Sequence, residues 1–335
     1  MLAKRLLSLG LTMGFSTLLA CDPVSPVETD TAPLSSEQAL HAGSAIQQVF
    51  VVMMENQNAK DVYGNPDAPY INQLMKDYGY ASNFQDCLPS SVPSEPHYIW
   101  LEAGTNAFSD VTFGGDGDAT PRNSTASTAH LVNLLDKAGI SWAAYQEGID
   151  STISGACPIS SNGLTRYAAK HNPFVFFKDV SGNPPSKTAS RCVAHNKPLS
   201  QFASDLSTGS VARYNLITPN LCHDMHGALG CSGGSNVKQG DTWLKGFLPS
   251  LITYAKANRG VILLTWDETE GTTTQPFLVI GSGLKRSGYE SKVRYDMSSV
   301  LKSIQRIFAV TPLLGHAADA STTDLSDFFA TGSFP

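Results

Sequence analysis

Apolar runs and amphipathic stretches alternate along the chain from residue 46 onward. Residues 46–54 form a nearly continuous apolar and β-branched run, which is typical of a strand covered on both faces. Shorter runs of the same kind predict strands at residues 140–145, 211–218, 261–266 and 277–280. Apolar positions at helical spacing predict helices over residues 68–79, 127–138, 241–258 and 298–310.

Local signals refine the ends of these helices. Gly79 is expected as the C-cap of the first helix, Asp241 as the N-cap of the third, and Pro249 as a kink within the third. Strands separated by helices predict an α/β fold, a three-layer α/β/α sandwich with a mainly parallel central sheet. In such sheets ligands bind outside the carboxyl ends of the strands.

The N-terminal region has a different pattern. Lys4 and Arg5 precede an apolar stretch over residues 6–20 that is too short for a comfortable membrane span, so residues 1–21 are predicted to be an export signal. The stretch ends in Leu18-Leu19-Ala20-Cys21, which resembles the lipobox of bacterial lipoproteins, and Cys21 is the expected lipidation site. An ordinary signal peptide with Cys21 as a chance thiol is the alternative.

The sequence after the signal divides into two parts. Residues 22–44 are rich in Pro, Ser and Thr without apolar periodicity, and are predicted to be a flexible tether. Residues 45–335 are predicted to form a single domain. We therefore expect a protein anchored to the bacterial cell envelope by lipid, on the periplasmic or outer side, or secreted.

Composition and charge exclude one class of function. Of the 335 residues 16% are charged, the net charge is −6, and no run of Lys or Arg is longer than a pair. A nucleic-acid partner is therefore not expected, and contact with a membrane is expected through the lipid anchor only.

Five cysteines remain after Cys21, in a compartment that allows disulfides. Proximity favours the pairs Cys222–Cys231 and Cys157–Cys192, although the connectivity is not readable from the sequence. A zinc cluster is the competing interpretation, but no two cysteines have C-x-x-C spacing.

Three of the predicted strands run directly into polar clusters. Residues 50–54 are followed by Glu55-Asn56, residues 261–266 by Asp267-Glu268, and residues 211–218 lead to His223-Asp224-Met225-His226. Each carboxylate taken singly is explained as the cap of a following helix. Together, at one sheet edge, carboxylate and imidazole groups predict a site for one or two divalent metal ions of unknown identity.

A hydroxyl nucleophile is predicted in the loop that precedes residues 98–103. Ser94, followed by Glu95 and Pro96, has the sequence of a helix N-cap, and this structural role would explain it completely. A helix N-terminus also favours negative charge, so a phosphorylated Ser94 would be stabilised there.

Five segments in order resemble the bacterial and fungal phosphoesterase family, which contains secreted acid phosphatases and phospholipase C-type enzymes and belongs to the alkaline phosphatase superfamily. The segments are V-V-M-M-E-N, P-S-E-P-H-Y, I-T-P-N-L-C-H-D-M-H-G, L-L-T-W-D-E and Y-D-M-S-S-V-L-K-S-I-Q-R-I-F. The resemblance implies an alkaline phosphatase-like fold and metal-dependent hydrolysis of phosphoric esters through a phosphoserine.

The resemblance also implies roles for individual residues. Ser94 would be the nucleophile, Asn56 would contact the phosphoryl group, and His97 stands where the family more often has Asn. The implied metal ligands are Glu55, Asp267, Glu268, Asp224 and His226. Met297 occupies a position where the family commonly has a metal-binding His, so His223 or Asp296 is expected to substitute, or one metal position is weak.

Other interpretations predict different chemistry. A surface-anchored binding protein would keep the fold without turnover, and a serine esterase would use Ser232 in the G-x-S-x-G match at residues 230–234, without metal. His41, His130, His171, His195 and His316 have no motif around them and are expected to be solvated or structural. The expected substrate is a phosphorylated small molecule or a phospholipid head group.

Overall fold

The computed structural model describes residues 46–149, 155–271 and 274–335. The predicted signal, the lipidation site Cys21 and the tether over residues 22–44 lie outside the described residues. Within the described part, no helix is long and apolar enough to cross a bilayer.

One eight-stranded sheet organises the structure, with the order β4-β3-β5-β1-β6-β7-β2-β8. The strands are β1 (Gln48–Met54), β2 (Gly79–Ala81), β3 (Trp142–Gln146), β4 (Asn196–Pro198), β5 (Tyr214–Thr218), β6 (Gly260–Trp266), β7 (Phe277–Gly281) and β8 (Tyr289–Ser291). The five strands from β4 to β6 are mutually parallel, which confirms the predicted mainly parallel sheet. β7 runs antiparallel to both of its neighbours, a direction that its apolar run does not encode.

Alternate side chains of β1 enter two separate cores. Val49, Val51 and Met53 pack on one side of the sheet, and Phe50 and Val52 pack on the other. Because both faces are buried, the strand is apolar at successive positions instead of alternating with polar residues.

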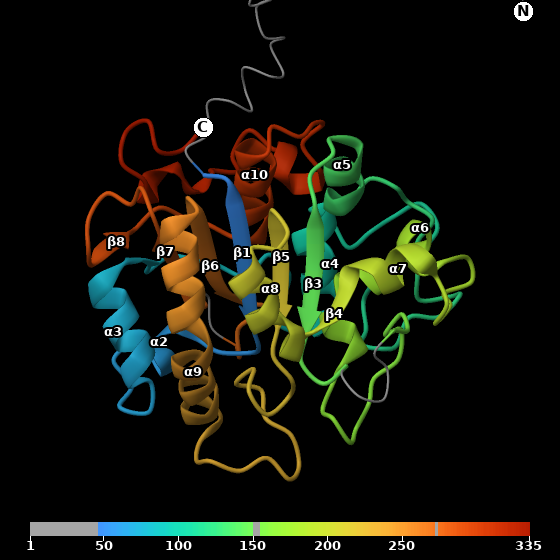
Figure 1. Cartoon of the computed structure of the whole chain (residues 1–335), viewed down its shortest axis with the longest axis horizontal. Coiled ribbons are helices and arrows are strands. Elements are labelled where there is room, and N and C mark those ends of the chain that lie inside the picture. Colours follow the sequence, from blue (N-terminus) through green and yellow to red (C-terminus); the bar gives the residue numbers. More distant parts are fainter. Residues whose placement is uncertain (1–45, 150–154, 272–273) are drawn as a thin grey trace, which may run out of the picture. The chain divides into compact units, whose positions relative to one another are not determined.

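Helices cover both faces of the sheet, as the sandwich prediction requires. One layer contains α3 (Pro69–Asp77), α8 (Phe202–Thr208) and α9 (Asn236–Ala257), and the other contains α4 (Ser94–Ala103), α5 (Leu131–Lys137) and α10 (Met297–Ile307). Figure 1 shows α8 and α9 crossing in front of the strands and α4 behind them. Short elements fill the connections: α2 (Ala59–Val62), α6 (Lys178–Ser181), α7 (Ser190–His195), η1 (Ala169–His171), η2 (Pro173–Phe176), η3 (Leu199–Gln201), η4 (Gly315–Ala318) and η5 (Leu325–Phe328).

Two predicted helix caps are wrong. Helix α9 begins at Asn236, where Ser235 accepts a hydrogen bond from the Lys238 amide, and it runs through Pro249. Asp241 is an internal residue of α9, and its carboxylate is buried. The carboxylate accepts hydrogen bonds from the Tyr70 and Ile71 backbone amides, so it caps the N-terminus of the neighbouring helix α3.

Gly79 also has another role. The C-cap of α3 is Tyr78, and Gly79 is the first residue of β2. A Cβ atom at Gly79 would lie 2.8 Å from Cδ1 of Phe328, so the glycine is explained by close packing against that ring.

Two disulfides join Cys157 to Cys192 and Cys222 to Cys231, while Cys87 is a free thiol. Both pairs are those that proximity favoured. Disulfides persist in oxidising compartments, which indicates an extracytoplasmic location.

Candidate active site

The carboxyl ends of three adjacent parallel strands carry the acidic residues. Strand β1 lies between β5 and β6, so the segments that follow these strands meet at one edge. The Glu55 amide donates to the Asp224 carbonyl at 2.7 Å, and the Asp267 amide donates to the Met54 carbonyl at 3.1 Å. The predicted convergence of the three polar clusters is therefore confirmed.

Ser94 lies among these carboxylates. Its side chain is only 2% exposed, and its Oγ lies 3.0 Å from Oε2 of Glu55 and 3.1 Å from Oε1 of Glu268. Ser94 is the first residue of α4, and the N-cap is Pro93, so the structural role of an N-cap does not explain Ser94. The hydroxyl has one proton, which it can donate to one of the two carboxylates at a time.

Asn56 connects two of the acidic residues. The Asn56 backbone amide donates to Oδ1 of Asp267 at 2.9 Å, and the side-chain Nδ2 donates to Oε1 of Glu268 at 3.0 Å. Glu268 therefore accepts hydrogen bonds from both Asn56 and Ser94, which fixes the carboxylate beside the serine.

His171 is a member of the site that the sequence analysis missed. Its Nε2 lies 3.2 Å from Oε1 of Glu55, and its Nδ1 lies 3.8 Å from Oδ2 of Asp224. The ring stacks on Tyr98, whose hydroxyl donates to the same Glu55 oxygen at 2.6 Å. His171 is buried, which contradicts the expectation of a solvated side chain but agrees with a structural one. The sequence offered only an indirect signal for His171. Met297 stands where the family commonly has a metal-binding histidine, so an imidazole from elsewhere in the chain was to be expected in the site.

Burial and mutual repulsion set the protonation of the site. Burial raises the pKa of Glu55 well above its usual range, and the nearby Asp267 and Asp224 carboxyls raise it further. Burial likewise raises the pKa of Asp224 and Asp267, and burial together with Asp267 raises the pKa of Glu268 to about 7. Burial lowers the pKa of His171 well below its usual value, with Lys170 contributing, so its imidazole is neutral.

These groups fit a divalent cation. Buried Oδ2 of Asp224, Oδ2 of Asp267 and Nε2 of His171 have no hydrogen-bond partner within the described part of the chain. Buried polar atoms are normally satisfied, and a neutral imidazole and carboxylate oxygens are suitable metal ligands. Glu55, Asp224, Asp267, Glu268 and His171 are the residues that could hold such an ion.

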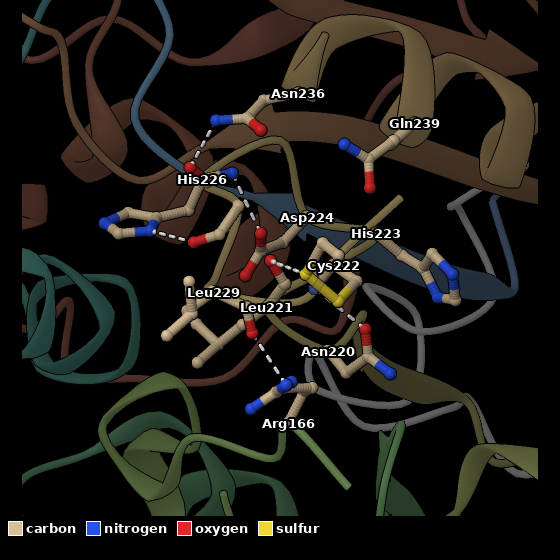
Figure 2. The surroundings of a disulfide bond; sticks show 12 residues. Arg166, Asn220, Leu221, Cys222, His223, Asp224, His226, Leu229, Asn236 and Gln239 are labelled. Atoms are coloured by element: carbon tan, nitrogen blue, oxygen red, sulfur yellow. Dashed lines mark hydrogen bonds between the residues drawn. A yellow bond between two sulfur atoms is a disulfide. The ribbon is translucent and has the colours of Figure 1, made fainter. Parts of the chain in front are cut away.

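The loop that follows β5 is closed by the Cys222–Cys231 disulfide beside Asp224 (Figure 2). Asp224 and Met225 are buried, and Oδ1 of Asp224 accepts a hydrogen bond from the His226 amide at 2.9 Å. Met225 packs so closely on α9 that a Cβ atom at Gly240 would lie 2.3 Å from its Cγ. The disulfide and this packing together place Asp224 in the site.

Residues 43–311 match the phosphoesterase family. The chain belongs to the phosphoesterase family. It is accordingly a hydrolase of phosphoric esters.

A phosphatidylinositol-3-phosphatase of Mycobacterium tuberculosis is 27% identical over 274 residues, which cover 81% of this chain and 80% of that protein. A probable acid phosphatase of Kluyveromyces lactis is 25% identical over 301 residues, covering 84% of this chain and 63% of that protein. The matched part is thus less than two thirds of the yeast enzyme.

Solved structures support the fold of this phosphoesterase. Murine ectonucleotide pyrophosphatase/phosphodiesterase 5 in complex with AMP is similar with a TM-score of 0.54 at 11% identity, covering 85% of this chain and 100% of that one. A phosphonate monoester hydrolase from Silicibacter pomeroyi gives 0.51 at 12% identity, covering 86% and 77%. Alkaline phosphatase-like architecture, as the sequence resemblance implied, is therefore confirmed.

His97 in this phosphoesterase lies one turn after Ser94 in α4 and is buried. Its Nδ1 contacts the Pro93 carbonyl at 3.0 Å and its Nε2 contacts Oδ1 of Asp86 at 2.8 Å. Although burial lowers its pKa, the Asp86 carboxylate outweighs this and raises the pKa of His97 to about 9. Asp86 also accepts from the Thr269 amide, so the His97 imidazolium ties α4 to the segment after β6. Both ring nitrogens are engaged in these contacts, and the catalytic role expected for His97 stays a prediction.

The expected substitutes for a missing imidazole have other partners. Asp296 is the N-cap of α10, and its Oδ1 accepts from the Ser298 and Ser299 amides in a capping box. His223 pairs with Glu147, with Nδ1 at 2.8 Å from Oε1. Neither residue has a recorded contact with the cluster, and His171 supplies the imidazole there instead.

Two further predicted residues lie at the edge of the site. His226 is exposed, and its Nδ1 contacts the Gly227 carbonyl; its role as a metal ligand stays a prediction. Met297 is buried as the first residue of α10 and belongs to the apolar core.

The G-x-S-x-G match does not form a nucleophile elbow. Ser232 is exposed in the loop between β5 and α9, and no strand immediately precedes it. The strand–turn–helix context that this motif requires is absent at residues 230–234, so the esterase interpretation has no structural support.

Proposed function

We propose that this phosphoesterase hydrolyses phosphoric monoesters through a phosphoserine formed on Ser94, with one or two divalent cations held by the acidic cluster. The observation that carries the proposal is the position of the Ser94 hydroxyl, buried and within 3.1 Å of both Glu55 and Glu268. A buried serine that donates to carboxylates has an acceptor for its proton at hand.

In the first half of the reaction Ser94 attacks the phosphorus. A bond forms between Oγ and phosphorus and the bond from phosphorus to the alcohol oxygen breaks. The serine proton passes to the carboxylate that Oγ contacts and from there to the departing alcohol oxygen. Asn56 lies beside Glu268 and offers its side-chain amide to the phosphoryl oxygens. The N-terminus of α4 favours the negative charge that accumulates on Ser94.

In the second half water cleaves the phosphoserine. The water oxygen bonds to phosphorus, the bond from Oγ to phosphorus breaks, and a proton returns to Ser94. The neutral His171, stacked on Tyr98, and the carboxylates keep the site polar and ordered while the surrounding core excludes bulk water. When bound, a divalent cation would neutralise charge on the phosphoryl oxygens, with Glu55, Asp224, Asp267, Glu268 and His171 as its holders.

The monoester substrate class is supported by the relatives, whose names describe a phosphatidylinositol-3-phosphatase and acid phosphatases. We propose a phosphorylated small molecule or a phospholipid head group as the substrate, and a location in the bacterial cell envelope through a lipid anchor on Cys21.

Phosphate release from an aryl phosphate, measured with and without chelator, tests the proposal. Wild-type protein should release phosphate, chelator should abolish the release, and Ser94→Ala should lower turnover by at least about a thousandfold. Ser190→Ala is the matched control, because Ser190 is likewise the first residue of a helix but is exposed in α7.

Three outcomes separate the possible functions. A Ser94→Ala variant that keeps most of its turnover would show that another group is the nucleophile. Turnover that resists chelator would remove the metal from the mechanism. A wild-type protein that binds phosphate esters without releasing phosphate would be the binding protein that the sequence also allowed.

A further inference from the structure

A cavity of about 310 Å³ lies near the N-terminus of α4. Asp116, Gly117, Arg166 and Lys170 are among the residues that line it. The backbone of Glu95, next to Ser94, donates to Oδ1 of Asp116 at 3.0 Å, and the Gly117 amide donates back to Oε2 of Glu95 at 2.8 Å. On the other wall, Lys170 immediately precedes His171. Residues that line the cavity are thus hydrogen-bonded to the neighbour of Ser94 on one side and adjacent in sequence to His171 on the other.

Two large apolar side chains project from the loops around this cavity. Leu164 is 96% exposed and Leu229 is 95% exposed, and within the described residues they stand apart from the other large apolar side chains in this respect. Leu164 lies in a tight turn, where the Asn162 amide donates to the Tyr167 carbonyl at 2.9 Å. Leu229 lies in the loop closed by the Cys222–Cys231 disulfide.

Arg166 joins the two loops that carry these leucines. Its Nη1 donates to the Gly163 carbonyl and its Nη2 donates to the Leu229 carbonyl, each at 2.7 Å. Figure 2 shows the second of these bonds. The Leu221 amide also donates to the Arg166 carbonyl at 3.1 Å. Arg166 therefore ties the backbone of the Leu164 turn to that of the Leu229 loop, so these backbones lose little conformational freedom when they bind a surface.

The charge of Arg166 supports an anionic surface. Both of its recorded hydrogen bonds go to carbonyl oxygens, so the guanidinium keeps its positive charge uncompensated by those partners. Lys170, deeper in the same cavity, pairs with Asp116. Cationic groups beside exposed apolar tips match the interface of a bilayer, where phosphate head groups lie above the hydrocarbon.

We propose that Leu164 and Leu229 insert into a phospholipid surface, and that the head group of a membrane phosphomonoester enters the cavity toward Ser94. The inference rests on the proposed function for the catalytic step, but the docking surface itself does not. A protein partner is less suitable, because a stable protein interface buries about 800 Å² on each side, far more than two loop tips supply. This surface would add membrane contact to the lipid anchor, which the sequence analysis expected to be the only one.

One experiment compares two forms of a single substrate. Full-length protein is assayed on phosphatidic acid in phosphatidylcholine vesicles and on dihexanoyl phosphatidic acid dissolved below its micelle concentration. We expect Leu164→Ser combined with Leu229→Ser to lower turnover on vesicles by about tenfold or more, since two apolar side chains no longer leave water, and to leave turnover on the dissolved lipid unchanged. Leu164→Ile combined with Leu229→Ile should behave as wild type.

A second measurement is independent of turnover. Leu164→Trp should show a blue-shifted emission and quenching by brominated phosphatidylcholine in the same vesicles, whereas Ser204→Trp, exposed on α8, should show neither. A serine pair that loses both activities equally, or a Leu164→Trp emission indifferent to brominated lipid, would overturn the docking surface. If wild type releases phosphate neither from these lipids nor from an aryl phosphate but Leu164→Trp is quenched, the proposed function fails and the docking surface stands.

Discussion

Nε2 of His171 lies 3.2 Å from Oε1 of Glu55, which places an imidazole from the η1 segment against the carboxylate at the end of β1. The same ring lies 3.8 Å from Asp224, at the end of the neighbouring strand. One histidine without a sequence motif thus lies between two acidic residues of the site, and we propose it as the nitrogen ligand that Met297 does not provide.

His171→Gln should weaken metal binding and turnover. The amide nearly keeps the size of the imidazole but is a poorer ligand, and we expect a loss of about 10- to 100-fold in kcat/KM together with less metal per protein by elemental analysis. His195→Gln is the control, because His195 stacks on Trp142 with ring centroids 3.9 Å apart, and we place it outside the ligand set. Unchanged metal content in His171→Gln would remove this residue from that set.

Chelator should lower the melting temperature, and added divalent ion should restore it. Glu55, Asp224 and Asp267 are buried together and their carboxyl pKa values are raised, so a bound cation stabilises the folded state by mass action. In the chelated protein, Asp267→Asn should raise the melting temperature, because it removes one of the repelling charges. A melting curve indifferent to chelator and metal would contradict a metal site here.

Glu95 predicts a dependence of stability on pH. Burial raises its pKa from 4.5 to about 8, so the folded protein holds a proton that the unfolded chain releases. Its contribution to the free energy of unfolding is present below about pH 4.5 and is lost as the pH rises to about 8, with a slope of at most about 1.4 kcal/mol per pH unit.

Denaturant titrations of Glu95→Gln across this pH range should therefore give a shallower loss of stability than wild type. The glutamine oxygen can still accept from the Gly117 amide, which Glu95 now binds at 2.8 Å. Glu270→Gln, at an exposed position, is the control. Equal slopes for wild type and Glu95→Gln would show that Glu95 is ionised when the protein is folded.

Asp296→Ala distinguishes a helix cap from a metal ligand. Since Asp296 accepts hydrogen bonds from two amides at the start of α10, its loss should cost about 0.5 to 2 kcal/mol in the free energy of unfolding and leave kcat and metal content unchanged. Ser235→Ala, which removes the N-cap of α9, should behave alike. A severe loss of metal in Asp296→Ala alone would instead make it a ligand. Met297→His should only destabilise, because it places a polar ring in the core.

The sequence by itself determined the layered α/β architecture and most of the acidic site. Continuous apolar runs such as residues 46–54 require burial on both faces, and parallel strands buried in this way end at a common edge. Glu55 and Asp267 follow directly after such strands and Asp224 lies in the loop after another, so their convergence was predictable from local pattern alone. The spacing of the cysteines favoured both disulfides for a similar reason, because short separations limit the geometry.

Tertiary structure decided the features that depend on contacts between distant segments. Asp241 caps a helix other than its own, and His171 reaches Glu55 from a connection that has no periodicity of its own. Arg166 likewise joins the Leu164 turn to the Leu229 loop through carbonyl groups that every residue possesses. A side chain that binds backbone atoms or a carboxylate far away in the sequence produces no recognisable motif in the sequence. The packing of the whole domain determines which group it contacts, and its neighbours in the chain do not.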